Sequence, residues 1–226
     1  AVQGHASLAA FLMKKQVRVA LTREESICMH PKRHPLTMEI EMGCDSNGRF
    51  TFVKSDIIGD TGSYASVGMK VLERAAGHAT GAYHVDAVEV RSRAVYTNNI
   101  PCGAMRGFGV NQINFAVESC VDELCEMGGF DRWQIRYDNA LTPGGMTSTG
   151  QVLQSGIGIR KTLEAVKDVF QQSRHAGIAC GIKNTGIGNG VPDTGKVKIV
   201  IESPERILIH QGLSLIHISE PTRLVS

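Results

Sequence analysis

The sequence predicts an α+β protein in which mixed β-sheet subdomains are backed by helices, and three patterns support this prediction. Apolar and polar residues alternate over residues 37–44 and again over 49–58, with an Asn-Gly pair between them, as in a β-hairpin with a tight turn. A third alternating stretch, 85–96, predicts another strand. Over 111–127 the apolar residues recur at helical spacing instead, so we expect a long amphipathic helix there.

Shorter elements are expected around these. Thr22 has capping-box spacing to Glu25, which predicts a short helical turn, and Asp131 can cap the helix that follows it. Further helices are expected at 1–15, 132–139 and 157–171, and further strands at 17–21, 178–185, 196–202 and 206–211.

A linker divides the chain. Residues 141–156 are rich in Gly, Thr and Pro, so 1–140 are expected to form a first subdomain and 157–212 to begin a second. Residues 213–226 are treated apart, because this string resembles the in-frame translation of a transposon-type sequencing adapter. We expect this tail to be non-native. The start at Ala1 rather than at a methionine suggests an internal piece of a longer protein.

Composition and charge argue against several classes of function. The net charge of +2 over 226 residues is too small to indicate nucleic acid or a membrane surface as a partner. No apolar run approaches the roughly 18 residues that a membrane span needs. The six cysteines form no C-x-x-C pair, and no Cys/His cluster has zinc-finger spacing. We therefore expect reduced thiols in a cytoplasmic protein, and no metal held by protein ligands.

Residues 98–112, between the predicted strand and the long helix, carry the clearest functional signal. Glycine lets the main chain approach a ligand closely, and a loop that leads into a helix N-terminus presents amide groups to an anion. Arg106 adds a fork of charged donors, and Phe108 adds a flat apolar face. On spacing alone we favour the simpler interpretation, a tight turn with a solvated arginine and a core phenylalanine.

Three segments together resemble the xanthine dehydrogenase and aldehyde oxidase family. The RGFG run at 106–109, followed by Gln112, is similar to the Arg-Gly-Phe-Gly loop of that family's large molybdenum-binding subunit. The runs GSYAS at 62–66 and VLERA at 71–75 resemble a second motif, and HPKRHP at 30–35 resembles a third. The motifs occur in the family's order, and the resemblance covers 1–212.

This resemblance implies a hydroxylase. Members hydroxylate N-heterocycles or aldehydes with oxygen from water, using molybdenum on molybdopterin, in its plain or its cytosine dinucleotide form. They pass the electrons to iron–sulfur and FAD partners. Arg106, Gly107 and Gly109 fall on the cofactor-binding loop. Phe108 falls on an aromatic residue that stacks on the substrate, and Arg74 on an arginine that stabilises negative charge developing there. For Arg74 a surface salt bridge on a helix is the alternative interpretation.

We therefore expect part of a xanthine dehydrogenase-like large subunit that acts on a purine-type heterocycle. Within the family the alternative substrate is an aldehyde or another N-heterocycle. Outside it, the alternative is a non-catalytic binding or subunit-interaction module. One departure concerns the substrate, because the family's second aromatic is expected just before Val191, where this chain has Asn189 and Gly190. The first glycine-rich cofactor loop and the catalytic glutamate are expected outside the chain, so this part alone should be inactive.

Overall fold

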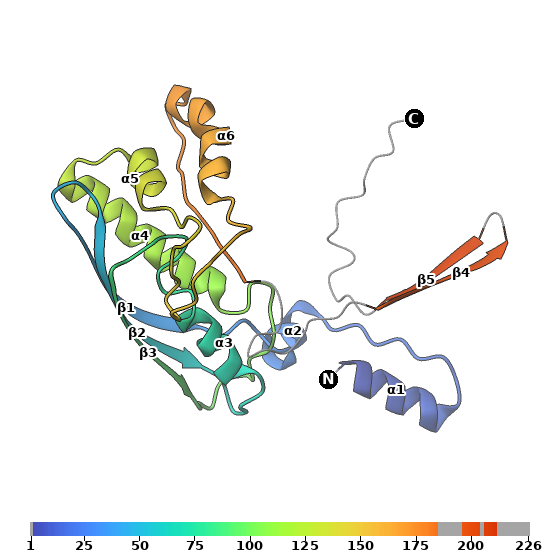
Figure 1. The fold of residues 1–226 in the computed structure, drawn as a ribbon. Coiled ribbons are helices and arrows are strands. Elements are labelled where there is room, and N and C mark those ends of the chain that lie inside the picture. The colour runs from blue at the N-terminus through green and yellow to red at the C-terminus, as the bar shows by residue number, and fades with distance from the viewer. Residues whose placement is uncertain (1, 185–195, 204–205, 212–226) are drawn as a thin grey trace. The chain divides into compact units, whose positions relative to one another are not determined.

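The computed structural model describes residues 2–184, 196–203 and 206–211, which fall into two compact units (Figure 1). The first unit extends to Lys183, and the second begins at Asn184. Our expectations for the adapter-like tail and for the residues just before Val191 lie outside the described residues. All three motifs of the family resemblance lie in the first unit.

A three-stranded mixed sheet forms the centre of the first unit, in the order β1-β2-β3. Its strands are β1 (Leu36–Cys44), β2 (Phe50–Asp60) and β3 (Ala87–Val95). β1 and β2 pair antiparallel, with Met38 opposite Ile57, whereas β3 runs parallel to β2. The predicted hairpin and the α+β class with a mixed sheet are therefore confirmed.

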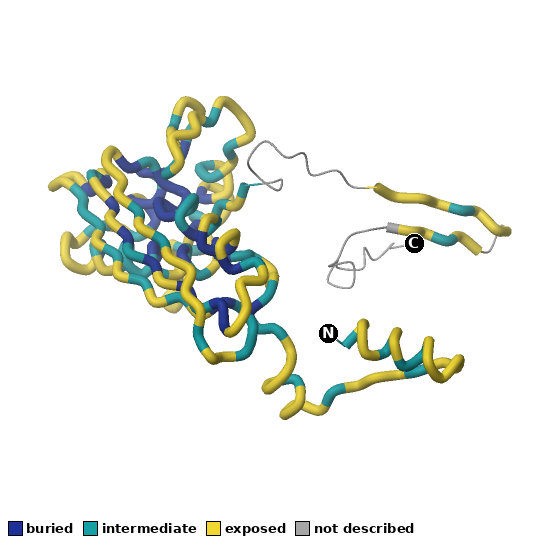
Figure 2. The backbone as a smooth tube through the Cα atoms, turned by 90° about the horizontal axis from the view of Figure 1, so that it is seen from below, coloured by how far each residue is buried: buried dark blue, intermediate teal, exposed yellow. Residues whose placement is uncertain are grey.

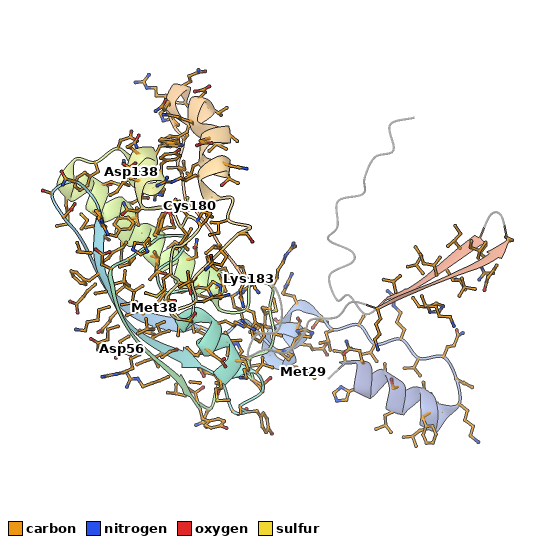
Figure 3. All side chains as sticks on the ribbon, viewed as in Figure 1. Met29, Met38, Asp56, Asp138, Cys180 and Lys183 are labelled. Carbon is orange, nitrogen blue, oxygen red and sulfur yellow. The ribbon has the colours of Figure 1, made fainter. Side chains whose placement is uncertain are left out.

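Two helices cover one face of this sheet, α3 (Gly68–Ala76) and α4 (Val110–Gly128). α3 packs on β2 and β3, α4 packs on β1, and the two helices contact each other. Buried residues gather in the interior of the first unit (Figure 2). One core cluster of strand and helix residues includes Val53, Ile57, Val71, Leu72, Ile113, Val117 and Val121. The opposite face carries exposed ion pairs, including Arg93 with Asp56, which is labelled in Figure 3.

Two further helices follow α4 in the first unit, α5 (Arg132–Asn139) and α6 (Ile159–Gln172). Asp131 caps α5 as predicted, because its side chain accepts a hydrogen bond from the Gln134 N–H at 2.7 Å. The Trp133 indole donates to the Leu163 carbonyl at 2.8 Å and fastens α6 to α5. The division of the chain at 141–156 stays a prediction, and α6 lies in the same compact unit as the sheet.

A buried polar network ties α4 to α5. The fully buried Arg136 guanidinium donates to Glu118 and to Asp122, at 2.9 Å in both cases. The buried Tyr83 hydroxyl also donates to Glu118, at 2.5 Å. Burial raises the pKa of the Tyr83 hydroxyl, and the Glu118 charge raises it further, so tyrosine remains the donor. The Glu118 carboxylate thus accepts from two buried donors, as a buried charge requires.

The chain begins with two helices, α1 (Val2–Met13) and α2 (Arg23–Met29). The capping box of α2 is confirmed, because Thr22 Oγ1 accepts from the Glu25 N–H at 3.2 Å and Glu25 Oε2 accepts from the Thr22 N–H at 2.8 Å. Two predicted strands are wrong: no strand forms at 17–21 or in the described part of 178–185. In the second segment alternate apolar side chains still pack on the core, which explains the misleading pattern.

In its described residues the second unit contains one antiparallel hairpin, β4 (Val197–Ser203) and β5 (Arg206–Gln211). Both predicted strands are therefore confirmed. Ile199 lies opposite Ile209, and Ile201 opposite Ile207. Each of these four side chains is more than half exposed. A two-stranded hairpin is marginally stable by itself.

Candidate cofactor-binding site

The loop of residues 98–112 follows β3 and leads directly into α4. Its first part is held by the segment that follows β2. The Cys102 N–H donates to the Thr61 carbonyl at 3.0 Å, and the Ser63 N–H donates to the Asn99 carbonyl at 3.1 Å. The motif at 62–66 therefore lies against the loop, although the two are distant in sequence.

Asp60, the last residue of β2, organises the base of the loop. Its carboxylate accepts hydrogen bonds from the Thr97 hydroxyl at 2.6 Å, the Asn99 amide at 2.5 Å and the Gly62 N–H at 2.7 Å. The bonds from Thr97 and then Asn99 contribute most to holding the pKa of the Asp60 carboxyl below its usual value. An ionised Asp60 thus fixes the point where β2 and the loop meet.

Three successive residues of the loop, Gly107, Phe108 and Gly109, have positive φ angles of 94°, 52° and 95°. At Gly109 a Cβ atom would lie 2.2 Å from the Val71 carbonyl oxygen and 3.1 Å from the Ala75 nitrogen, so only glycine fits against α3. Phe108 is strained, because side-chain-bearing residues rarely adopt this φ. Its half-buried ring packs on the core cluster. Strain of this kind is often found at functional sites.

The two predicted arginines have different surroundings. Arg106 is exposed, and in the described part of the chain its guanidinium has no hydrogen-bond or ion-pair partner. Arg74 is half-buried in the last turn of α3. The next residue, Ala75, has the backbone nitrogen that would lie 3.1 Å from a Cβ atom at Gly109. The structure therefore brings the loop against the helix of Arg74. Among the described residues, no hydrogen bond, ion pair or cation–π contact joins the side chains of Arg74, Arg106 and Phe108.

A recess with a volume of 360 Å³ adjoins the first part of the loop. It is lined by Lys32, Arg33, Pro35, Asp60, Asn98, Asn99, Ile100 and Cys102. None of the predicted site residues lines this recess. Their convergence on one shared cavity stays a prediction.

Sequence reasoning did not single out His34 and Gln112 as buried polar groups of the site. His34 is 2% exposed, and burial lowers the pKa of its imidazole, with Asp60 opposing this effect. The Gln112 side-chain amide donates to the His34 carbonyl at 3.2 Å. Gln112 Oε1 and His34 Nε2 are buried without a hydrogen-bond partner among the described residues. No local pattern in the sequence marks these two residues as buried, since Pro35 indicates only extended backbone at His34.

A family model for the molybdopterin cofactor-binding domain matches residues 1–140. This chain belongs to the molybdopterin-binding family of the molybdenum hydroxylases. Over 167 residues it is 41% identical to the nicotinate dehydrogenase large molybdopterin subunit of Eubacterium barkeri, covering 74% of this chain and 39% of that protein. Over 221 residues it is 30% identical to a probable xanthine dehydrogenase subunit of Bacillus subtilis, covering 93% and 30%.

Solved structures of molybdenum hydroxylases share this fold. The aldehyde oxidoreductase from Desulfovibrio gigas aligns with a TM-score of 0.60 and 29% identity, over 62% of this chain and 15% of that one. The quinoline 2-oxidoreductase from Pseudomonas putida aligns with a TM-score of 0.62 and 26% identity, over 73% and 22%. This molybdopterin-binding chain thus spans well under half the length of each of these four relatives.

The loop carries groups of the kind that suit an anionic cofactor. α4 begins with no side-chain cap and no acidic residue in its first turn, which favours an anion at this helix N-terminus, although the Val110 N–H already donates to the Gly107 carbonyl at 3.1 Å. The exposed Arg106, in the same loop, adds a group with charged donors. In the described part of the chain, no three His, Cys, Asp or Glu side chains are grouped as metal ligands. No described helix is long and apolar enough to cross a membrane.

Proposed function

We propose that this chain is part of the large subunit of a molybdenum hydroxylase that hydroxylates an N-heterocycle of the xanthine or nicotinate type with oxygen from water. The observation that carries the proposal is the glycine loop, which is fixed against α3 at Gly109 and leads into the uncapped N-terminus of α4. The names of the two relatives in Eubacterium barkeri and Bacillus subtilis support the substrate class, since both nicotinate and xanthine are N-heterocycles.

In this proposal four residues of the loop and Arg74 of α3 have separate roles. Arg106 and the first amide groups of α4 bind anionic oxygens of the cofactor. Gly107 and Gly109 let the main chain lie close to its neighbours, and the Phe108 ring offers a flat face on which a heterocycle can stack. The half-buried Arg74 guanidinium stabilises the negative charge that develops on the heterocycle. The bound molybdenum centre supplies the two-electron oxidation.

Electrons would then pass to an iron–sulfur and an FAD subunit or domain. We also propose a cytoplasmic location, because all six cysteines are free thiols, as is usual in a reducing compartment. The cytosine dinucleotide form of the cofactor is the form we propose to test first.

Removal of the loop arginine tests the assignment. In the complete subunit, Arg106→Ala should lower the bound molybdenum and pterin about tenfold or more, because hydrogen bonds from a charged donor contribute about 1.5–3 kcal/mol. Arg106→Lys should retain part of the bound molybdenum and pterin. Arg174→Ala, at another exposed arginine, serves as the control and should leave the content unchanged. Metal analysis of the purified subunits measures the difference, and normal occupancy in Arg106→Ala would contradict the role of the loop.

Aldehyde oxidation is the second candidate function, and the structural match to the aldehyde oxidoreductase from Desulfovibrio gigas favours it. Turnover of xanthine, nicotinate and an aromatic aldehyde by the complete enzyme, with an artificial electron acceptor, separates the two. A preference for the aldehyde would replace the N-heterocycle assignment. A molybdenum-free complete protein that still binds its subunit partners would instead support a non-catalytic interaction module.

A further inference from the structure

Residues 31–34, which we call the brace, run along the incoming end of the loop. Lys32 and Cys102 form an isolated parallel β-bridge, and the Gly103 N–H donates to the Lys32 carbonyl at 2.9 Å. A Cβ atom at Gly103 would lie 3.0 Å from the Pro31 side chain, so the two backbones are packed closely. These contacts fix the point at which the chain enters the functional loop.

The same brace also holds the outgoing end of the loop, in the first turn of α4. One Arg33 guanidinium nitrogen donates to Asn111 Oδ1 at 3.1 Å, and the Gln112 amide donates to the His34 carbonyl at 3.2 Å. Asn111 Oδ1 also lies 2.4 Å from where a Cβ atom of Gly107 would stand. The Asn111 side chain therefore lies between the brace and the glycine that follows Arg106.

The brace is itself anchored. His34 is buried at its end, and the Lys32 ammonium group at its start donates to the carbonyls of Ser26 and His30, the latter at 2.9 Å. The brace is thus fastened to the end of α2 on one side and to the core on the other.

We propose that the brace is a positioning element of the cofactor site: it grips both ends of the loop and so fixes the conformation in which Arg106 is presented. Arg33, Asn111 and Gln112 are its positioning residues. This inference rests on the proposed function, because it takes the molybdopterin cofactor as the ligand of the loop. None of the three side chains is assigned a contact with the cofactor or the substrate.

The physical reason is preorganisation. A glycine-rich loop samples many conformations, and ordering it at the moment of binding lowers the affinity for the ligand. Fixing both of its ends beforehand removes part of that entropic cost. At the incoming end the contacts are made by backbone, whereas at the outgoing end they are made by side chains. The outgoing end can therefore be released by substitution without changing residues 103–110.

The experiment uses the complete subunit and measures hydrogen exchange of the amides of residues 103–110 together with molybdenum content. In Arg33→Ala and Gln112→Ala these amides should exchange about fivefold faster, the ratio expected for loss of one ordinary hydrogen bond. Molybdenum content should fall in the same variants. Asn111→Ala should also show faster exchange and a lower molybdenum content. Asn111→Asp keeps the acceptor for Arg33, so its loop exchange should stay close to that of the unaltered protein. Only exchange is compared in this variant, because its added negative charge in the first turn of α4 would itself weaken anion binding. Gln171→Ala, on the exposed side of α6, is the control.

The outcomes separate a positioning role from a general structural one. Faster exchange confined to the loop, with the thermal midpoint of the subunit unchanged, supports the brace. Unchanged loop exchange in the Arg33→Ala, Gln112→Ala double variant overturns it, and so does faster exchange with normal molybdenum content. If the unaltered subunit carries no molybdenum, the proposed function fails, and the exchange data still decide whether the brace holds the loop. Faster exchange throughout α4 and the sheet would show a structural role only and would also overturn the inference.

Discussion

Replacement of Gly109 by alanine tests whether the functional loop is held against α3. With φ at 95°, an alanine would be strained by about 1–2 kcal/mol. Its Cβ atom would also stand 2.2 Å from the Val71 carbonyl oxygen, a backbone atom that cannot turn aside as a side chain can. Forcing the loop away from the helix adds about 1–3 kcal/mol, the usual cost of overpacking. We expect a total loss of about 2–5 kcal/mol in the local stability of the loop and α3.

Gly129, at the end of α4, provides the matched control. Its φ is also positive, at 67°, but no atom lies within 4 Å of its Cβ position. Gly129→Ala should therefore lose only the strain of about 1–2 kcal/mol. Native-state hydrogen exchange of the complete subunit is the suitable assay, because it reports local opening and does not require two-state unfolding of a large protein. Equal losses in the two alanine variants would refute the close contact between the loop and α3.

Two further predictions concern the framework of the site. Glu118→Ala should lower the stability of the subunit by about 3–5 kcal/mol in thermal unfolding, because it leaves the buried Arg136 charge short of a partner. Glu123→Ala, at an exposed position of α4, is the control. A loss of stability in Glu118→Ala no larger than in this control would contradict a stabilising role of the buried Arg136–Glu118 pair. Asp60 has a depressed pKa, so its contribution is present above its unfolded pKa and is lost as pH falls through the folded pKa, below about pH 4. Asp60→Asn should flatten that acid loss in a pH series of unfolding midpoints, and identical pH profiles would argue against the Thr97 and Asn99 bonds.

Local patterns in the sequence were sufficient for much of the fold. The hairpin follows from alternation and a tight turn, the Asp131 cap from side-chain chemistry, and α4 from helical spacing. The strand expected at 178–185 shows the limit of such patterns. Every second side chain of this segment does pack on the core. A strand also needs a hydrogen-bonded neighbouring strand, however, and an alternating sequence does not show whether one is present.

The site could be predicted only in part, for a similar reason. The family resemblance selected the loop, and the structure places that loop against the segments that carry the other two motifs. Which atoms make those contacts depends on tertiary packing. The burial of His34 and the hydrogen bond from Gln112 to its carbonyl have no periodic pattern in the sequence. The positive φ of Phe108 is similarly invisible, since nothing local favours it at phenylalanine.

These contacts also suggest why the motifs occur together in the chain. A site whose metal is carried by a pterin depends on how accurately the protein positions donors around that pterin, and flexible glycine loops position donors poorly unless something else holds them. Here the loop packs closely against α3 at Gly109, and its base is hydrogen-bonded to Asp60. The brace contacts both ends of the loop. The HPKRHP and GSYAS motifs would then be needed for the geometry of Arg106, and substitutions in them should affect cofactor binding without touching the cofactor.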